Sequence, residues 1–327
     1  MGEFELIRRY FTRPTPRAVL GVGDDCALLQ PRPGMQLAIS SDMLVEGRHF
    51  LSTVSPAALG HKALAVNLSD LAACGAQPLA FTLALALPRA DAAWLEPFSE
   101  GLLSLADAHR CELVGGDTTQ GPLNICITVF GEVPPGQALL RSGAQVGDDV
   151  YVSGTLGDAR LALEVFRGTV SVPEAIFTQA RARLERPTPR VALGLALRGL
   201  ASAAADISDG LLGDLGHILR ASQVGAVIDT SIAITLIAAS AINVSANSLS
   251  DAEKCLPYVL AGGDDYELVF TAPPSVRQKV ADAATQADTR VTRIGQIEAR
   301  SAQASVRLVN AHGAPVLHTF AGFDHFI

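Results

Sequence analysis

At 327 residues, with 49% hydrophobic and only 18% charged residues, the chain is long enough for two packed domains and too apolar to be disordered. The net charge of −8 at pH 7 argues against a nucleic-acid-binding surface, which would be basic. It also argues against direct binding of a polyanion without metal cations in between. Five cysteines without a C-x-x-C motif argue against a disulfide framework or a zinc site and favour a reducing cytoplasm.

The N-terminal stretch MGEFELIRRYF has early acids and no long apolar core, so no signal peptide is predicted. The most apolar stretch, 226–246, contains Asp229 and many hydroxyl side chains. We interpret it as a buried strand with its connections and not as a membrane span. We therefore expect a cytoplasmic protein that does not bind a membrane.

Strands and helices alternate in the first part of the chain. The expected elements are a helix at 4–11, strands at 18–23, 26–30 and 35–40, a helix within 55–78, a strand at 79–88, a helix within 92–110, and strands at 112–117 and 124–134. The helix from Ser55 is the clearest, because Ser55 suits the N-cap, Pro56 the first helical position and Gly75 the C-terminal cap. The hydrophobic runs are long enough to be covered on both faces, which predicts an α/β fold.

A stretch rich in glycine and serine at 141–159 is typical of a domain junction. It leads into a new strand, a glycine turn and a new helix, and a second α/β region follows with a proline-rich elbow at 185–190. The sequence therefore predicts one domain at 1–140 and a second at 148–327.

Aspartates recur beside small residues and apolar runs. The motifs are VGDDCALL at 22–29, AISSDML at 38–44, NLSDLA at 67–72, LVGGDTT at 113–119, DISDGL at 206–211 and AGGDDYELVF at 261–270. Two carboxylates about 4 Å apart repel by roughly 4 kcal/mol at an effective dielectric constant near 20, so converging acids need cations. Oxygen ligands without Cys or His favour Mg²⁺ or Ca²⁺, and Mg²⁺ usually binds together with substrate phosphates.

Any one of these aspartates is more often a turn former or a helix cap than a metal ligand. Asp209 could simply cap the helix expected at 210–221, and Asp148 with Asp149 could only mark the junction. Asp70 is different, because it lies within a predicted helix with Asn67 three residues earlier on the same face. This polar pair on an apolar helix predicts a binding partner.

The glycine loops alone are weak indications. The loop GTLGDA at 154–159 resembles a strand–turn–helix connection whose backbone N–H groups could meet an anion. The sequence has no P-loop motif, no protein-kinase motif and no G-x-S-x-G. His49, seven residues after Asp42, is either an ordinary loop histidine or a ligand contact.

A series of motifs nevertheless follows a recognisable order. The series is GVGDDCALL, AISSDMLVEGRHF, GHKALAVNLSDLAACGAQP, LVGGDTTQGP, LRSGAQVGD, VSGTLGDA, RPTPR, DISDGLLGDLGHI and AGGDDYELVF. It resembles the thiamine-monophosphate kinase family, from the ATP-binding superfamily of aminoimidazole ribonucleotide synthetase. The similarity covers nearly the whole chain, down to GFDHF at 322–326.

The resemblance implies a two-domain α/β (α+β) fold of the aminoimidazole-ribonucleotide-synthetase type. It implies a homodimer in which the N-terminal Mg²⁺- and ATP-binding domains pair their sheets, and a C-terminal domain that completes the active-site cleft of each chain. The implied reaction converts ATP and thiamine monophosphate into ADP and thiamine diphosphate with several Mg²⁺ ions. The attacking phosphate oxygen would already be ionised, so positioning and charge neutralisation would suffice.

The resemblance also implies roles for individual residues. Mg²⁺ would be bound or positioned by Asp25, Ser40, Ser41, Asp42, Asp70, Asp117, Asp206 and Asp209. ATP would contact Gly116, Asp117, Arg141 and Ser208, and thiamine monophosphate would contact His49, Asp264 and Phe323. The residues expected to act in catalysis are Asp42, Asp70, Asp117 and Arg141.

Three positions depart from the family pattern: Ser41 replaces a frequent Thr, Asp264 a common Glu and Phe323 a frequent Tyr. Two alternatives remain open. One is another ATP-dependent member of the superfamily, acting on a purine intermediate or in selenophosphate or hydrogenase maturation chemistry, which would keep the acids and lose the thiamine contacts. The other is a non-catalytic Mg²⁺–nucleotide-binding scaffold, against which Arg141 together with the acids argues.

Overall fold

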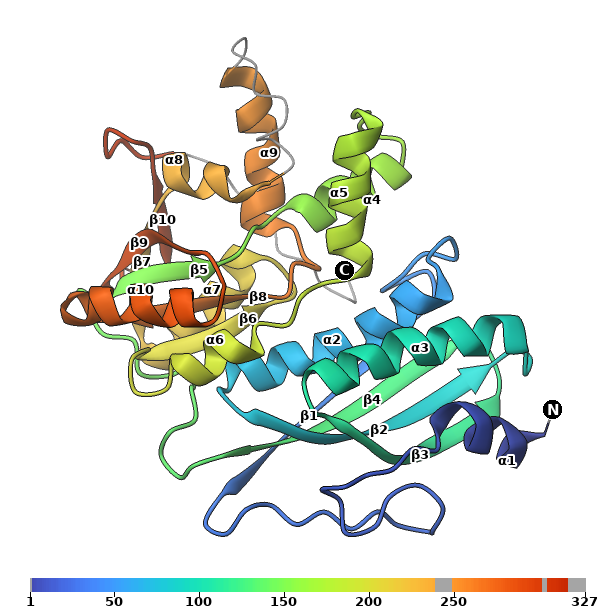
Figure 1. The fold of residues 1–327 in the computed structure, drawn as a ribbon. Helices are drawn as coiled ribbons and strands as arrows, with labels where there is room; N and C mark the ends of the chain where they lie inside the picture. The colour runs from blue at the N-terminus through green and yellow to red at the C-terminus, as the bar shows by residue number, and fades with distance from the viewer. Residues whose placement is uncertain (1, 239–248, 302–304, 317–327) are drawn as a thin grey trace. The chain divides into compact units, whose positions relative to one another are not determined.

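The computed structural model describes residues 2–238, 249–301 and 305–316, and it divides into two compact units (Figure 1). Unit 1 comprises residues 1–71 and 76–138, and unit 2 comprises 72–75 and 139–327. Each unit has its own sheet with helices packed against it, which confirms the predicted two-part α/β class. The domain limits predicted from the sequence, 1–140 and 148–327, stay a prediction.

Unit 1 begins with a short helical segment. An α-helical turn, α1 (Glu3–Leu6), continues into a π-helical turn, η1 (Ile7–Phe11), in agreement with the helix expected at 4–11. The strands expected at 18–23 and 26–30 do not form, and only isolated bridges such as Leu20 with Leu28 occur there. The apolar pattern predicted these strands wrongly, because no neighbouring strand forms a continuous series of backbone hydrogen bonds with this loop.

The sheet of unit 1 has the strand order β1-β4-β2-β3. Its strands are β1 (Gln36–Val45), β2 (Gln77–Leu87), β3 (Glu112–Gln120) and β4 (Asn124–Val133). The pairs β1/β4 and β4/β2 are antiparallel, and β2/β3 is parallel. The helices α2 (Pro56–Ala73) and α3 (Ala92–Ala108) cover one face of this sheet (Figure 1).

The opposite face of this sheet differs from the expectation that helices cover both sides. There β1 exposes Leu37, Ile39 and Met43, with 46%, 60% and 52% of their surface accessible.

The expected capping of α2 is confirmed, because the Ser55 hydroxyl accepts a hydrogen bond from the backbone N–H of Ala58 at 3.2 Å and Pro56 opens the helix.

Unit 2 contains a six-stranded sheet in the order β10-β7-β9-β5-β8-β6. Its strands are β5 (Asp149–Ser153), β6 (Ala203–Ile207), β7 (Val224–Asp229), β8 (Glu267–Ala272), β9 (Val291–Ala299) and β10 (Val306–Val309). Only β10 and β7 pair in parallel among the strand pairs of these described elements. The sheet is therefore mainly antiparallel, like that of unit 1.

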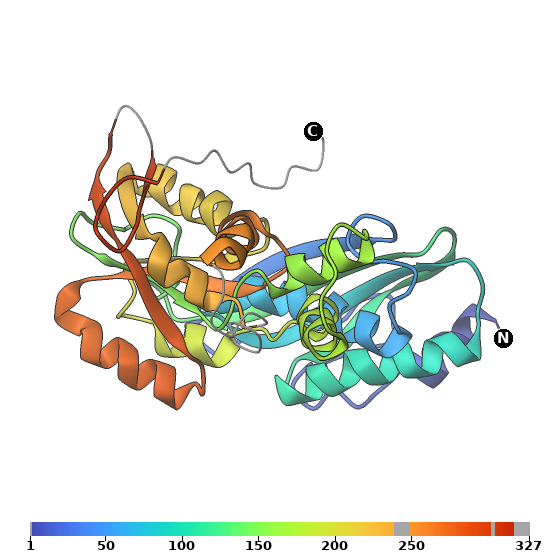
Figure 2. The ribbon, with the colours of Figure 1, turned by 90° about the horizontal axis from the view of Figure 1, so that it is seen from above.

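Helices lie on both faces of this second sheet. They are α4 (Asp158–Phe166), α5 (Glu174–Glu185), α6 (Val191–Ala196), α7 (Leu211–Ser222), α8 (Thr230–Ala233), η2 (Ile234–Leu236), α9 (Leu249–Ala261), η4 (Pro274–Val276) and α10 (Arg277–Gln286). Figures 1 and 2 show α10 on one face and α7 with α9 on the other. Leu156, Leu215, Val259 and Val269 belong to the core under α4, α7 and α9.

The apolar stretch at 226–246 begins as the buried strand β7, as expected, and continues into α8 and η2. Residues 239–246 lie outside the described part of the chain. Among the helices of the described residues, none combines the length and the apolar character that crossing a bilayer requires.

Candidate active site

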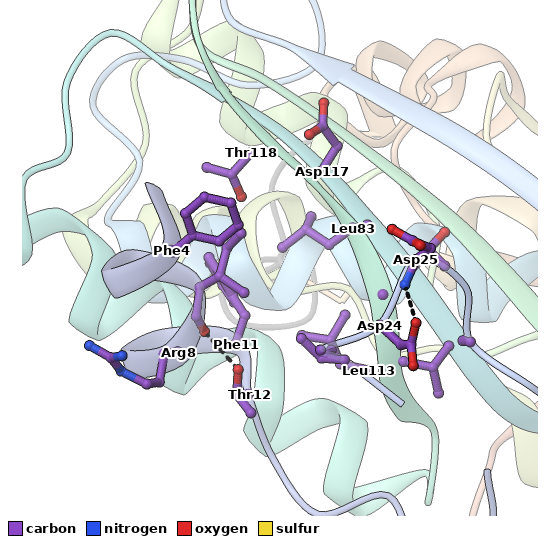
Figure 3. A pocket seen from close by; sticks show the side chains of 18 residues that line it. Phe4, Arg8, Phe11, Thr12, Asp24, Asp25, Leu83, Leu113, Asp117 and Thr118 are labelled. Carbon is purple, nitrogen blue, oxygen red and sulfur yellow. Dashed lines mark hydrogen bonds between the residues drawn. The ribbon is translucent and has the colours of Figure 1, made fainter. Parts of the chain in front are cut away.

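A pocket of about 760 Å³ lies in unit 1 beside the N-terminal helical segment (Figure 3). The carboxylates of Asp24, Asp25 and Asp117 line it together with the backbone of Gly116. Three acids at one pocket favour cations or cationic ligands. The pocket therefore brings together Asp25, Gly116 and Asp117, all of which the sequence predicts as site residues.

A β-bulge places Asp117 at this pocket. The register of β2 against β3 shifts between Phe81 and Thr82, so that Val114 is an extra residue in β3. Gly116 then has φ +142°, and a Cβ atom there would lie 1.9 Å from the carbonyl oxygen of Leu83. Only glycine fits this close approach, and the exposed Asp117 follows it directly.

The neighbouring pair Asp24 and Asp25 sits in an exposed loop. The backbone N–H of Asp25 donates a hydrogen bond to Oδ1 of Asp24 at 2.8 Å, which closes a tight turn after Gly23. Both carboxylates remain accessible to solvent, where ionised groups are stable without a buried partner. They are thus placed to accept a ligand and do not hold the core together.

A second group of site residues lies between β1 and α2. The hydroxyl of Ser40 donates a short hydrogen bond to Oδ2 of Asp70, and the backbone N–H of Asp42 donates to Oδ1 of Asn67 at 3.1 Å. The Asn67 and Asp70 pair therefore meets polar groups of β1, and the side-chain amide N–H of Asn67 also donates to the carbonyl of Ala63 in α2 at 3.0 Å.

Ser41 lies on the other face of β1, because side chains alternate along a strand. Its hydroxyl is 3.0 Å from that of Thr128 and donates to the carbonyl of Ile127 at 3.2 Å. The Ser41 hydroxyl is therefore separated from Asp42 and Asp70.

His49 follows β1 in a loop that fixes its ring. Nδ1 accepts a hydrogen bond from the backbone N–H of Val45 at 3.0 Å, so Nε2 carries the proton in the neutral ring. The carbonyl of His49 accepts a hydrogen bond at 3.2 Å from the buried Lys62, a residue that the sequence analysis missed. The signal in the sequence that could have identified Lys62 was its position as a lysine within an apolar helix.

In unit 2, Asp206 lies near the end of β6, and the loop between β6 and α7 carries Ser208 and Asp209. Oδ2 of Asp214 accepts hydrogen bonds from the N–H groups of Ser208, Asp209 and Gly210 at 3.1, 3.0 and 3.1 Å. Burial raises the pKa of Asp214 to about 7, although these backbone bonds oppose the rise. Asp209 makes no side-chain cap to α7, so simple helix capping does not explain it.

The segment Gly263–Tyr266 lies against this loop. The N–H of Asp264 donates to the carbonyl of Ser208 at 2.9 Å, and the N–H of Tyr266 donates to that of Ile207 at 2.8 Å. A Cβ at Gly263 would lie 2.6 Å from the Ser208 carbonyl oxygen. Asp206, Ser208, Asp209 and Asp264 are therefore gathered at one edge of the sheet of unit 2.

The sequence analysis missed two buried acids, Asp265 within this segment and Glu267 just after it. Both carboxylate oxygens of Asp265 accept from the N–H of Gly157, at 3.1 and 3.0 Å, and burial raises the pKa of Asp265 well above its usual value. A backbone N–H of the GTLGDA loop thus binds a side chain of the protein itself. The signal in the sequence for these acids was the presence of charged residues within the apolar run DDYELVF.

Glu267 is the second of these acids and is completely buried. It forms ion pairs with Arg183 at 2.7 Å and with Arg190 at 2.5 Å, and it accepts from the Ser153 hydroxyl at 2.5 Å. Arg190 comes from the proline-rich elbow at 185–190. These contacts fix the start of β8, directly after Asp264 and Asp265.

Arg141 is exposed at the start of unit 2, and its carbonyl accepts from the Ser222 hydroxyl at 3.2 Å. Burial lowers the pKa of His217, and the positive charge of Arg141 lowers it further, so the guanidinium lies near α7. Phe323 lies outside the described residues.

The donor set of these clusters fits Mg²⁺. The exposed or half-exposed site residues offer carboxylate and hydroxyl oxygens, the ligands that Mg²⁺ prefers. Within the described ranges, no three His, Cys, Asp or Glu residues form a group that could hold a metal ion. Phosphate oxygens of a substrate would therefore complete the coordination, as is usual for Mg²⁺.

Comparisons with known proteins agree in both units. Two family models match: AIR synthase related protein, N-terminal domain, at 23–133, and AIR synthase related protein, C-terminal domain, at 145–306. The thiamine-monophosphate kinases of Salmonella typhimurium (strain LT2) and Escherichia coli (strain K12) are each 45% identical to this chain. Both alignments cover 99% of it and 98% of the relative.

Solved structures give the same result. The crystal structure of thiamine-monophosphate kinase from Stenotrophomonas maltophilia K279a is similar with a TM-score of 0.81 and 45% identity, covering 93% of this chain and 94% of that one. AaThiL complexed with AMPPCP and TMP has a TM-score of 0.72 and 31% identity, covering 91% and 89%. The hydrogenase maturation protein HypE in complex with ATP, at 19% identity and a TM-score of 0.76, shares the fold alone.

Proposed function

We propose that this chain transfers a phosphoryl group from ATP to thiamine monophosphate, because it belongs to the thiamine-monophosphate kinases within the AIR synthase related proteins. The products are ADP and thiamine diphosphate. The observation that carries the proposal is the pocket of unit 1, where Asp25 and Asp117 flank the bare backbone of Gly116. A role in hydrogenase maturation is not favoured, since HypE shares only the fold.

The chain's own residues supply positioning and charge. In this proposal Asp25, Asp42, Asp70 and Asp117 hold Mg²⁺ together with Ser40, and Asp206 and Asp209 hold further ions in unit 2. Bound Mg²⁺ neutralises the charge on the phosphoryl group in transfer. The backbone of Gly116 lines the pocket and contacts a phosphate of ATP in this proposal.

The substrates would be oriented by residues that the structure holds in defined positions. Arg141 and Ser208 contact ATP in this proposal, and Arg141 can donate bidentately to phosphate. His49 presents Nε2 toward thiamine monophosphate, while Asp264 lies beside the Ser208 loop. The acceptor phosphate is already ionised near neutral pH, so no side chain has to remove a proton.

The proposal includes a homodimer in the cytoplasm. The exposed apolar residues Leu37, Ile39 and Met43 of β1 support pairing of two copies through this face of the sheet. Cys26, Cys74, Cys111, Cys126 and Cys255 are free thiols, which is typical of a reducing compartment.

The direct test is product analysis. The protein is incubated with ATP, Mg²⁺ and thiamine monophosphate, and thiamine diphosphate and ADP are quantified by chromatography. We expect equal amounts of both products, and none after chelation of Mg²⁺. Reaction of free thiamine or of an aminoimidazole precursor, without reaction of the monophosphate, would overturn the assignment.

A further inference from the structure

The pocket of unit 1 has a second half that phosphate and metal binding do not use. Asp24, Asp25 and Asp117 lie toward one side, whereas Phe4 and Phe11 of the N-terminal segment lie at the other (Figure 3). Ligand pockets typically combine such an apolar wall with a few polar groups, and they measure about 300–1,000 Å³. A volume of about 760 Å³ leaves room for more than a triphosphate.

Phe4 is the most unusual residue of this wall. It is 81% exposed, although Leu6, Tyr10 and Phe11 of the same segment are buried. The segment therefore packs through these three side chains and leaves the ring of Phe4 at the pocket. A single exposed aromatic ring needs no explanation by itself, but this one lines a pocket whose far side is polar.

The backbone of the segment is also unusual. Residues 7–11 form a π-helical turn, a rare conformation that is frequently found at functional sites. Ile7 and Phe11, and likewise Arg8 and Thr12, come to the same pocket wall. The hydroxyl of Thr12 donates to the carbonyl of Ile7 at 3.2 Å and closes this turn. The wide turn thus presents a continuous wall and not a single side chain.

We propose that the segment Phe4–Thr12 is the base-binding wall for the nucleotide, with Phe4 stacking on the adenine ring. The proposal rests on the proposed function, since it takes ATP as the ligand whose phosphates meet Asp117. Aromatic stacking is tolerant of base identity, but it favours the larger purine rings over pyrimidines. Phe4 is therefore a specificity-determining residue that acts on the nucleobase and not on the phosphates.

The test compares two ligands that share phosphates and differ in the base. Thermal shifts of Phe4→Ala and wild type are measured with Mg-ATP and with Mg-tripolyphosphate, which has no nucleoside. We expect the dissociation constant for Mg-ATP to rise at least about fivefold in the variant, because base stacking on an aromatic ring carries that much affinity. Stabilisation by tripolyphosphate should match wild type, since ligand-linked stability follows affinity.

A matched control and a kinetic readout complete the design. Val19→Ala removes another exposed apolar side chain of unit 1, 63% accessible and outside the pocket lining, and should leave both shifts unchanged. In steady-state kinetics, Phe4→Ala should raise KM for ATP at least about fivefold, with kcat and KM for thiamine monophosphate near wild type. The preference for ATP over CTP should fall in parallel.

The outcomes separate this proposal from the proposed function. Unchanged Mg-ATP binding in Phe4→Ala would overturn the base-binding wall, and so would an equal loss with both ligands, because the segment would then serve the phosphates or the fold. Wild-type protein that is stabilised by Mg-ATP but does not convert thiamine monophosphate would refute the proposed function alone. The two-ligand comparison would still decide the role of Phe4.

Discussion

The triplet Gly-Asp-Asp occurs three times, at 23–25 in unit 1 and at 147–149 and 263–265 in unit 2, and the first and last copies differ in what their acids contact. At 23–25 both carboxylates are exposed in a loop of unit 1. At 263–265 the first carboxylate lies beside the Ser208 loop, and the second is completely buried against the N–H of Gly157. The same three residues thus serve a ligand pocket in one unit and hold a segment in place in the other.

The difference teaches that the partner, and not the motif, decides what an acid does. The exposed acids of unit 1 repel one another until cations bind. Three buried acids of unit 2, Asp214, Asp265 and Glu267, are already matched by backbone N–H groups or arginines. Substitutions of the exposed acids in unit 1 should therefore change activity, and substitutions of these three buried acids should change stability.

The largest expected effect comes from Glu267→Gln. It leaves Arg183 and Arg190 without their buried counter-charge, and breaking one partner of a buried ion pair typically costs about 3–5 kcal/mol. Urea denaturation should show a loss of this size. Glu298→Gln, which breaks the exposed pair with Arg307, is the matched control and should cost below about 1 kcal/mol. Equal losses of unfolding free energy in the two variants would contradict the proposed difference between the buried and the exposed ion pair.

Asp70→Asn tests an acid of unit 1, for which the comparison predicts a loss of activity and not of stability. The asparagine can still accept the hydrogen bond from Ser40, so the melting temperature without ligand should match or exceed that of wild type. Activity should fall by about 10³, in the range for loss of an electrostatic group that acts on the transition state. Asp107→Asn, on the exposed surface of α3, should keep full activity. Near-normal turnover at saturating Mg²⁺ would make Asp70 a structural residue.

Arg141 is an exposed charge in unit 2 and should behave like the acids of unit 1. We expect Arg141→Ala to lower kcat/KM for ATP by about 10². Arg141→Lys should recover only part of this loss, because lysine keeps the charge without the bidentate geometry. The melting temperature without ligand should stay unchanged in both variants, and stabilisation by Mg-ATP should shrink. Wild-type values for both ATP kinetics and this shift would exclude a phosphate contact.

The smallest expected effect is the pH dependence that Asp214 contributes. Its pKa is about 7 in the folded protein and 3.8 as the ordinary value, so the folded state binds the extra proton between these limits. This contribution to stability is full below pH ~4, falls as the pH rises and is lost above pH ~7. Asp214→Asn, which keeps an acceptor oxygen, should therefore gain roughly 2 kcal/mol relative to wild type between pH 5 and pH 7.5. Parallel stability profiles of the two proteins would contradict this.

Much of the local structure could be predicted from the sequence, because it depends on nearby residues. The cap at Ser55, the start at Pro56 and the run of β2 all follow from short-range patterns. The strands expected at 18–23 and 26–30 failed because a strand requires a partner that local pattern does not reveal.

The candidate site was predictable in its residue types but not in its grouping. Strand alternation, applied to β1, already separates the side chain of Ser41 from those of Ser40 and Asp42. In contrast, the bond of Asp265 to Gly157 and the pairs of Glu267 with Arg183 and Arg190 join residues far apart in the chain. Such contacts depend on the completed fold, and one sequence gives no sign of the pairing.

The three backbone bonds that Asp214 accepts have a further consequence for ligand binding. They order residues 208–210 during folding, so the conformational entropy of this loop is lost before any ligand arrives. A ligand that meets this loop encounters a preorganised surface and loses less affinity to ordering. The amide protons of Ser208, Asp209 and Gly210 should accordingly exchange slowly with solvent even in the free protein. In the loop at 22–27, by comparison, the N–H of Asp25 is bound by the exposed carboxylate of Asp24, so its exchange should be faster.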